Sequence, residues 1–365
     1  MPKVKKRVVG SVTKADLEAL KIVSQGVPGL ITVNHMEEER IVPTLITSYN
    51  RAMGSGGHVL RRMIAIHGKN STGKSVLAAG IAESCRRYGH VPFIEEAEWS
   101  AESRWLNRLV TGEGTLFKMP ADLDELFSDI QIGLKNLERA KAKGSIAEHV
   151  GCCFVVDTLT KLIPKEMYDK LITEGVSKSY PLQAAWVSLW SKFIVPQTYR
   201  SNSSLVIVLQ ERQNLNAGAF QKQRKVTLGE ALLYDVSHRI ECTYSKPIKE
   251  NGKVVAVQFF FKVEKNKTDG WTEQEGSFFT STGEGDTPPG FDIAREAIEE
   301  AKQRKVIKNV KVGRMPHQAV QFPDEEKPSL LVEGGVEDLR LYLNANRGDL
   351  QQFVDNLNQT ARRQG

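Results

Sequence analysis

One stretch of the chain decides its fold: Arg62-Met63-Ile64-Ala65-Ile66-His67-Gly68-Lys69-Asn70-Ser71-Thr72-Gly73-Lys74-Ser75-Val76-Leu77. Residues 64–66 predict a short buried strand, and residues 68–75 match the pattern G-x-x-x-x-G-K-[ST]. Residues 76–87 follow as a helical run rich in Ala and Leu. A strand, a glycine-rich loop and a helix in this order are typical of a loop that binds nucleotide phosphates.

Each residue type in this loop suits a nucleotide. Glycines let backbone N–H groups turn toward the phosphates, and the helix that follows adds the positive end of its dipole. We expect Lys74 to reach the β- and γ-phosphates of ATP and the Ser75 hydroxyl to ligate Mg²⁺. A plain Gly- and Ser-rich turn is the alternative. The predicted cofactor-binding residues of the loop are Gly68, Lys69, Asn70, Ser71, Thr72, Gly73, Lys74, Ser75 and Val76.

Composition bounds the other possibilities. The chain has 365 residues, a formal charge of +6 and a pI near 9.0, which suits two to three domains or one large core. No apolar run approaches the roughly 20 residues of a membrane span, and residues 1–7 lack the apolar segment of a signal peptide. We therefore expect a cytoplasmic protein with no membrane partner. The four cysteines show no metal-ligand spacing and are expected to be reduced core residues.

Three further apolar runs end in polar residues. Residues 91–94 lead into Glu95-Glu96-Ala97-Glu98, residues 152–156 end at Asp157, and residues 204–209 end at Gln210. Carboxylates at strand ends beside a phosphate-binding loop are placed to polarise a water molecule or to hold the Mg²⁺ shell, and a glutamine there can sense the γ-phosphate. A solvated acidic turn remains the alternative for the first run.

Between these runs, helical patterns cover residues 13–25, 45–53, 101–109, 123–143 and 182–198. Residues 165–178 are polar without a clear period, so a mobile loop is expected there. Residues 213–226 are poor in apolar residues and hold three cations and no acid, which favours a loop that orders on an anionic partner over a plain solvated loop.

Taken together, the motifs resemble the bacterial RecA strand-exchange recombinases over nearly the whole chain. The most discriminating is V-x-K-N-K at residues 263–267, because phosphate-loop proteins in general lack it. The divergence between motifs also fits a bacteriophage-encoded relative. The segments that carry the resemblance are residues 68–75, 93–98, 154–157, 207–212, 227–232 and 261–267.

The resemblance implies roles at the nucleotide. Glu98 matches the glutamate that activates water, with Glu96 the competing choice because this chain has an extra glutamate. Gln210 matches the switch glutamine, and Lys265 and Lys267 match a pair that reaches a neighbouring subunit's ATP. The remaining matches are Asp157 for the metal shell with Ser75, Glu102 for adenine contact, and Trp105, in place of the usual Tyr, for adenine stacking.

The resemblance also implies two DNA-binding loops, at about residues 165–181 and 213–227. Tyr180 lies at the apolar wedge position of the first loop, which is longer in this chain. The second loop departs from the family's Thr- and Gly-rich closing segment. Its expected DNA-binding residues are Arg212, Phe220, Lys222, Arg224 and Lys225.

The expected fold is α/β. Residues 1–33 form a basic arm and an oligomerisation helix, residues 34–282 a RecA-type ATPase core with a mostly parallel twisted sheet, and residues 283–365 a small α/β C-terminal domain that gathers DNA. That domain should hold helices at 291–305, 336–344 and 348–357. Its expected basic surface includes Lys302, Arg304, Lys305, Lys308, Lys311 and Arg314.

The function implied is that of an ATP- and Mg²⁺-dependent homologous recombinase. It would form helical filaments on single-stranded DNA, hydrolyse ATP, and pair that strand with duplex DNA for recombination and repair, including the SOS response. Single-stranded DNA-binding protein and loading factors are the expected helpers. The alternatives are a hexameric DNA helicase or translocase and a recombination-mediator ATPase, both built on the same core.

Overall fold

A computed structural model of the chain describes residues 40–98, 103–110, 114–174, 180–213, 224–226, 229–268, 272–313, 315–322 and 328–364. The arm and helix expected within residues 1–33 lie outside the described residues. Of the described helices, none combines the length and the apolar character needed to cross a membrane.

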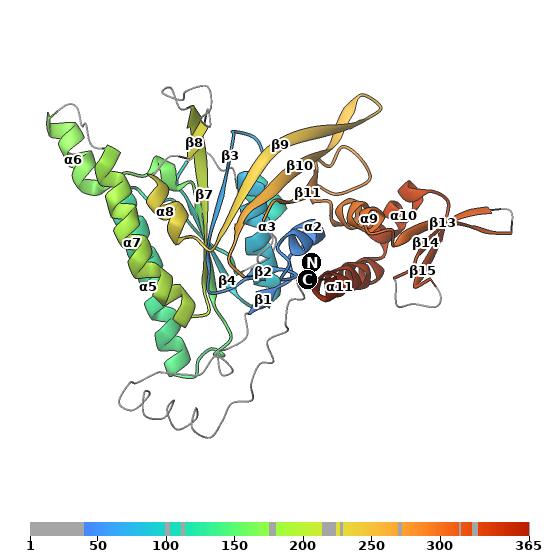
Figure 1. The fold of residues 1–365 in the computed structure, drawn as a ribbon, viewed down its shortest axis with the longest axis horizontal. Helices are drawn as coiled ribbons and strands as arrows, with labels where there is room; N and C mark the ends of the chain where they lie inside the picture. The colour runs from blue at the N-terminus through green and yellow to red at the C-terminus, as the bar shows by residue number, and fades with distance from the viewer. Residues whose placement is uncertain are drawn as a thin grey trace, which may run out of the picture. The chain divides into compact units, whose positions relative to one another are not determined.

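A large mixed sheet forms the centre of the fold, and its strand order is β12-β11-β10-β9-β3-β7-β6-β4-β5 (Figure 1). β3, β7, β6, β4 and β5 run parallel, β9 is parallel to β3, and β9 to β12 form antiparallel pairs. The strands are β3 Met63–Gly68, β4 Val91–Glu96, β5 Leu116–Lys118, β6 Cys152–Asp157, β7 Ser204–Gln213, β9 His238–Glu250, β10 Lys253–Asn266, β11 Gln274–Ser281 and β12 Gly290–Phe291.

Helices cover both faces of the sheet because its central strands are apolar on both sides. In β3, Ile64 and Ile66 face one core cluster, and Met63 and Ala65 face the other. Figure 1 shows α5 and α7 on one side of the sheet and α2 and α3 on the other. These elements are α2 Thr47–Ala52, α3 Lys74–Arg87, α4 Ser103–Leu109, α5 Leu123–Ala142, η2 Leu159–Lys161, α7 Tyr180–Arg200, α8 Gly229–Asp235 and the small pair β1 Ile41–Val42 and β2 His58–Val59.

The expected α/β fold and the strand that precedes the phosphate-binding loop are confirmed. The prediction of a mobile loop at residues 165–178 is wrong for residues 165–174, which form a helix. α6 spans Lys165–Glu174. Its apolar residues Met167, Tyr168, Leu171 and Ile172 recur at helical spacing, a pattern that the sequence prediction missed. Met167 is buried, while Tyr168 and Ile172 are exposed. An ion pair of 2.6 Å between Lys170 Nζ and Glu166 Oε1 links successive turns.

The second expected loop also differs from its prediction, because both of its ends are strands. β7 continues to Gln213 and pairs antiparallel with β8, Arg224–Val226. The register matches Glu211 with Val226 and Gln213 with Arg224. The two described ends of the segment expected to bind DNA therefore form a two-stranded extension of the central sheet.

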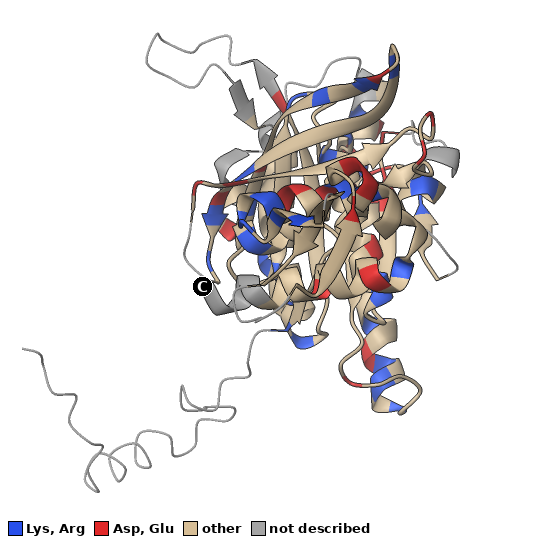
Figure 2. Cartoon of the chain, turned by 90° about the vertical axis from the view of Figure 1, so that its right-hand side faces the viewer, with Lys and Arg blue, Asp and Glu red and all other residues tan. Residues whose placement is uncertain are grey.

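The C-terminal part adds a three-stranded sheet, in agreement with the expected small α/β domain, although the sequence patterns located only its helices. Its order is β13-β14-β15, and its core is shared with three helices. The prediction that Arg304 belongs to a basic surface is wrong, because its side chain is 8% exposed and donates to Glu300 and to the Leu357 carbonyl. In Figure 2, acidic segments lie among the basic ones. The elements are α9 Ile293–Gln303, β13 Ile307–Val312, β14 Met315–Val320, β15 Leu330–Glu333, α10 Val336–Ala345 and α11 Arg347–Gln364.

A buried carboxylate joins α9 to the start of α2. Glu296 Oε2 accepts hydrogen bonds from Thr47 N at 3.0 Å and Thr47 Oγ1 at 2.6 Å, and Glu296 Oε1 accepts one from Ser48 N at 2.8 Å. The residue that precedes α2, Ile46, offers no side-chain cap, so Glu296 satisfies the first backbone donors of that helix.

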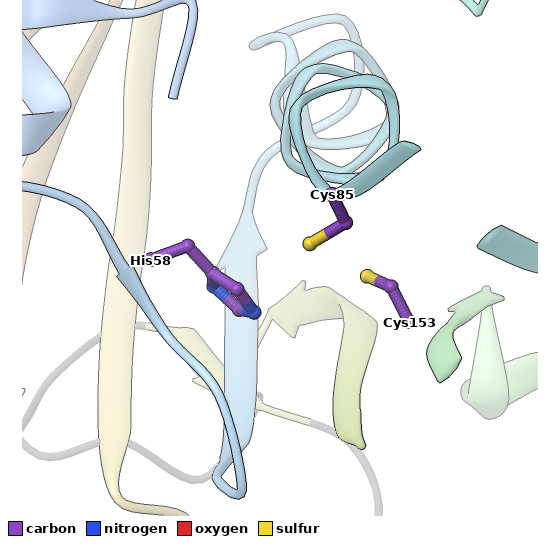
Figure 3. Close-up of side chains that lie close together, drawn as sticks. All are labelled: His58, Cys85 and Cys153. Carbon is purple, nitrogen blue, oxygen red and sulfur yellow. The ribbon is translucent and has the colours of Figure 1, made fainter. Parts of the chain in front are cut away.

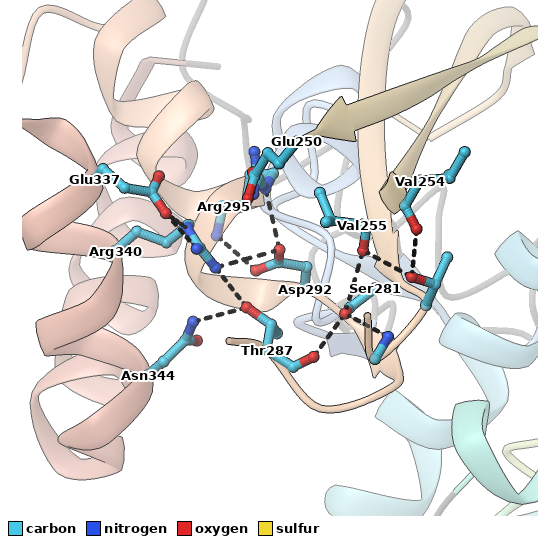
Figure 4. Close-up of polar contacts among 12 residues, drawn as sticks. Glu250, Val254, Val255, Ser281, Thr287, Asp292, Arg295, Glu337, Arg340 and Asn344 are labelled. Atoms are coloured by element: carbon cyan, nitrogen blue, oxygen red, sulfur yellow. Dashed lines mark hydrogen bonds and ion pairs between the residues drawn. The ribbon is translucent and has the colours of Figure 1, made fainter. Parts of the chain in front are cut away.

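A second polar cluster holds the turn between β11 and α9 (Figure 4). Arg340 is 4% exposed and donates to the Thr287 hydroxyl, to which Asn344 Nδ2 also donates at 3.1 Å. Asp292 Oδ1 accepts from Arg295 N at 3.1 Å and thereby caps α9. The turn-rich segment between these elements is thus fixed by buried charged groups.

We predict that Glu296→Ala lowers the free energy of unfolding by roughly 2 to 4 kcal/mol, because it leaves the first N–H groups of α2 buried without an acceptor. Urea unfolding measures the change. Glu299→Ala on the same helix is the control: its side chain is 42% exposed, and loss of its pair with Lys302 should change stability by less than about 0.5 kcal/mol. Equal effects of the two substitutions would contradict the capping role.

Candidate nucleotide site

The site lies at one edge of the sheet, where the parallel strands β3, β4 and β6 end and their neighbour β7 continues toward β8. Strand register pairs Gly68 of β3 with Gln210 of β7, and Glu96 of β4 with Asp157 of β6. The polar residues that follow four separate apolar runs therefore meet beside the phosphate-binding loop. This edge is where open α/β sheets bind ligands.

Two glycines shape the loop between β3 and α3. Gly68 has φ of 147°, and a Cβ atom there would lie 2.2 Å from the Cys242 carbonyl oxygen. Gly73 has φ of 94°, and a Cβ atom there would lie 2.4 Å from the Phe259 ring. Any other residue would be strained at both positions, so the loop can approach its neighbours closely only with glycine.

Lys74 is the first residue of α3, and its side chain curls back over the loop. The residue is 8% exposed, and Nζ donates to the Lys69 carbonyl at 2.5 Å. Burial lowers the pKa of Lys74, while the charges of Cys242, Asp157, Glu98 and Glu211 act in the opposite direction. A cation held at a helix N-terminus, close to backbone N–H groups, suits an anionic phosphate.

Ser75, Asp157 and Glu96 line a small cavity beneath the loop. Burial raises the pKa of Asp157 to about 6; a hydrogen bond with Ser75 lowers it, and the charges of Glu98 and Glu96 raise it. Hydroxyl and carboxylate oxygens are the ligands that Mg²⁺ prefers, and Mg²⁺ usually keeps several waters. The donors present therefore fit the predicted metal-binding pair of Ser75 and Asp157.

The structure separates the roles open to the three glutamates after residue 94. Glu98 Oε1 accepts a hydrogen bond from Gln210 Nε2, and Glu96 Oε1 accepts one from Glu98 N at 3.1 Å. Glu95 is fully buried, and burial, followed by the charge of Asp129, raises its pKa to about 7. Glu98 thus contacts the expected switch glutamine, and Glu96 lines the cavity beside Ser75 and Asp157. Glu95 neither contacts Gln210 nor lines that cavity.

The two expected interface lysines lie at the end of β10 in different surroundings. Lys265 Nζ donates to the carbonyls of Leu233 and Tyr234, both at 2.9 Å, near the end of α8. Lys267 is exposed. Burial lowers the pKa of Lys265, and the nearby charge of Lys267 lowers it further. Two cations close together at the surface are suited to an anion that both can reach.

Several predicted residues cannot be placed. Glu102, Phe220 and Lys222 lie outside the described residues. The backbones of five others are described, in α4, α7, β7 and β8, but their side chains are not: Trp105, Tyr180, Arg212, Arg224 and Lys225.

Sequence reasoning missed His67, which directly precedes the loop. Its Nδ1 lies 2.8 Å from Glu211 Oε1, and its Nε2 lies 2.9 Å from Glu264 Oε2. The sequence does contain a glutamate directly after Gln210 and another directly before Lys265. Their relation to His67 becomes visible only when the pairing register of the strands is known.

Two of the four cysteines meet a histidine in the core on the α3 side of the sheet (Figure 3). Ligand atoms of His58, Cys85 and Cys153 lie within 4.8 Å of one another, and all three residues are buried. His58 Nε2 lies 2.9 Å from the Ser204 hydroxyl, and burial lowers the pKa of His58 to about 3. Neutral thiols and a neutral ring are the forms that such burial favours, as expected for reduced core cysteines.

We predict that Mg²⁺-dependent ATP binding weakens as the pH falls through about 6, because a proton then competes with the metal for Asp157. Titration with a fluorescent ATP analogue between pH 5 and 8 measures this. The Asp157→Asn variant should bind ATP more weakly, and its affinity should not depend on the protonation of residue 157. ATP itself also takes up a proton in this range, but this affects both proteins equally, so it cancels in the ratio of the wild-type affinity to the variant affinity. A ratio independent of pH would contradict the role of Asp157.

Comparison with known proteins supports the same reading of these motifs. The sequence model of a protein family, the RecA N-terminal domain, matches residues 26–275 of this chain. Protein RecA of Helicobacter pylori (strain P12) is 25% identical over 314 residues, which cover 84% of this chain and 85% of that protein. Protein RecA of Helicobacter hepaticus is 26% identical over 254 residues, which cover 68% of this chain and 69% of that protein.

A third relative matches a shorter part. Protein RecA of Mycoplasma mycoides subsp. mycoides SC is 26% identical over 219 residues, so the chain spans 59% of that protein. These identities are low, but the family model covers well over half of the chain, including the phosphate-binding loop and the edge of the sheet described above. The chain belongs to the RecA family.

Proposed function

We propose that this protein is a DNA-dependent ATPase that assembles as a helical filament on single-stranded DNA and pairs that strand with a homologous duplex. The observation that carries the proposal is the hydrogen bond between Glu98 and Gln210, at the point where β7 passes from the nucleotide site to the β7–β8 extension. A change at the nucleotide is thereby transmitted along one strand to the segment expected to hold DNA.

In this proposal, the residues of the loop and the strand ends divide the chemistry. The loop N–H groups and Lys74 bind the phosphates, and Ser75 and Asp157 hold Mg²⁺, which neutralises charge on the phosphates when bound. Glu98 accepts a proton from the attacking water and orients that water. Gln210 exchanges its bond to Glu98 for a contact with the γ-phosphate, so that hydrolysis resets β7.

Assembly completes the site. Lys265 and Lys267 of one subunit would neutralise the phosphates bound by the next, as cations supplied in trans do in other phosphate-loop enzymes. Lys265 must first leave the Leu233 and Tyr234 carbonyls, and a nucleotide on the neighbouring subunit provides the charge that offsets this loss. Filament growth would therefore depend on bound ATP.

DNA binding would use the segment carried by β7 and β8. Lys222, Arg224 and Lys225 would neutralise phosphates of a single strand, which makes binding sensitive to salt. The protein would hold the backbone, and base pairing with the incoming duplex would read the sequence. ATP hydrolysis would release the DNA.

We predict that Lys74→Ala abolishes nucleotide-dependent assembly, because the phosphates lose their main cation. Electron microscopy with single-stranded DNA and a slowly hydrolysed ATP analogue should show open filaments of the wild type and none of the variant. Lys143→Ala, at an exposed position after α5, is the matched control. Closed rings of the wild type would indicate a helicase, and no strand exchange despite filaments would indicate a mediator.

We predict that Lys265→Ala and Glu98→Ala proteins are each inactive in DNA-stimulated ATP hydrolysis but recover activity when mixed. In a randomly mixed head-to-tail filament, about one quarter of the interfaces join an intact Glu98 to an intact Lys265, so about one quarter of the wild-type rate is expected. Steady-state hydrolysis with single-stranded DNA measures it. No recovery in filaments that contain both proteins would exclude a site shared between subunits.

A further inference from the structure

The side chain of His67 joins three strands of the central sheet. It lies on β3, Glu211 lies on β7, and Glu264 lies on β10. The two ring nitrogens lie 2.8 and 2.9 Å from the two carboxylates, one on each side. Arg239 of β9 lies 2.6 Å from the same Glu264 oxygen that faces the ring.

These groups are largely removed from water. The side chains of His67, Glu211 and Glu264 are 5%, 10% and 11% exposed. Two carboxylates on one ring require both nitrogens to donate, and only the protonated imidazole has two N–H groups. Burial lowers the pKa of His67, but its bonds to Glu211 and Glu264 outweigh burial, and the net direction is upward.

A bulge in β10 directs Glu264 toward this site. Val263 is paired with Ile240 and Lys265 with Arg239, so the pairing advances by two residues on β10 and by one on β9. Glu264 is the additional residue. Bulges of this kind redirect a side chain beside a functional site, and here the redirected carboxylate meets His67.

Each member of the bridge is next in the chain to a residue of the proposed machinery. His67 precedes Gly68, which begins the phosphate-binding loop, and Glu211 follows Gln210. Glu264 precedes Lys265. Neighbours on a strand share a peptide unit, so fixing the three side chains of the bridge fixes the backbone under the loop, the switch glutamine and the interface lysine together.

We propose that His67 is a positioning residue whose imidazolium couples the phosphate-binding loop to Gln210 on one side and to Lys265 on the other. The inference rests on the proposed function, because it assigns the coupling between ATP, DNA and the neighbouring subunit to one ring. When His67 loses its proton, it can donate to only one carboxylate, and Glu211 and Glu264 then face each other without a cation between them. The strands that carry the switch glutamine and the interface lysine then lose the side-chain link that joins them through β3.

Other charged groups around the ring define the electrostatic setting of this bridge. β9 contributes Arg239 and also Glu241, which is paired with His67 in the parallel register of β3 and β9. From α3, the charge of Lys74 interacts with Glu211. Asp235, at the end of α8, interacts with Lys265. The two carboxylates bonded to the ring are the nearest partners and set its protonation.

The test compares His67→Phe, which keeps a ring but removes both bonds, with wild type. DNA-stimulated ATP hydrolysis should fall by roughly tenfold to hundredfold, as expected for loss of a charge-assisted hydrogen bond, while binding of a fluorescent ATP analogue without DNA changes by less than about threefold. The wild-type rate should fall as the pH rises through the raised pKa of His67, and the rate of the variant should not. His149→Gln, an exposed histidine, is the control and should behave as wild type.

A second variant, Glu211→Gln with Glu264→Gln, keeps the ring but removes its negative partners. NMR of protein labelled with carbon-13 at histidine Cε1 should show His67 titrating above its ordinary value of about 6.5 in the wild type and at lower pH in this variant. The alkaline fall in the hydrolysis rate should move with it. This variant also serves if His67→Phe does not fold.

The inference would be overturned by a His67 pKa at or below the ordinary value in the wild type, or by a folded His67→Phe protein with the wild-type rate and pH profile. Loss of rate with an unchanged pH profile would reduce His67 to a purely structural residue and also contradict the proposal. If the wild type shows no stimulation by DNA, the proposed function fails and the coupling with it. The NMR titration then reports separately whether the bridge itself exists.

Discussion

The parallel register of β3, β7, β6 and β4 is the constraint on which the rest of the structure depends. It aligns the ends of four strands, so that Gly68 lies beside Gln210 and Glu96 beside Asp157. Hydrogen bonding along the whole length of each strand enforces this alignment, because a slip of one residue would turn every side chain to the other face. The buried apolar sheet thus sets which strand ends meet, and polar contacts between those ends, such as the His67 bridge, act within this framework.

The same register explains why buried charge is concentrated at this edge. The strands are apolar on both faces until their last residues, so the polar residues at this edge are held against the core: Glu96 is 5% and Lys74 is 8% exposed. Asp157 and Lys74 show opposite consequences: burial raises the pKa of the acid and lowers that of the base. Both groups are thereby prepared for partners of opposite charge, and the His67 bridge shows that the same edge can supply such partners internally.

Four parallel strands of the core, β3, β4, β6 and β7, could be predicted because each is an apolar run that ends abruptly at a polar residue. The glutamates after Ile94 could not be told apart from the sequence, because an extra residue leaves open which of them faces the loop. Strand pairing places Glu96 beside Asp157, and Glu98 contacts Gln210, and no single segment encodes either neighbour. α6 does carry apolar residues at helical spacing, and its polar composition obscured that pattern, whereas β8 is recognisable only opposite β7. The His67 bridge depends on a bulge and three registers, none of which a single segment encodes.

The contacts of Glu296 determine where this protein can be truncated. The turn after β11 is an obvious place to end a shorter fragment, because residues 283–290 are rich in Gly and Pro. A fragment that ends in that turn would lose the carboxylate on which the first backbone donors of α2 rely, together with Glu300, which pairs with Arg51 at 2.7 Å. A shortened fragment should therefore be designed to retain α9, and its C-terminus is better placed beyond Gln303.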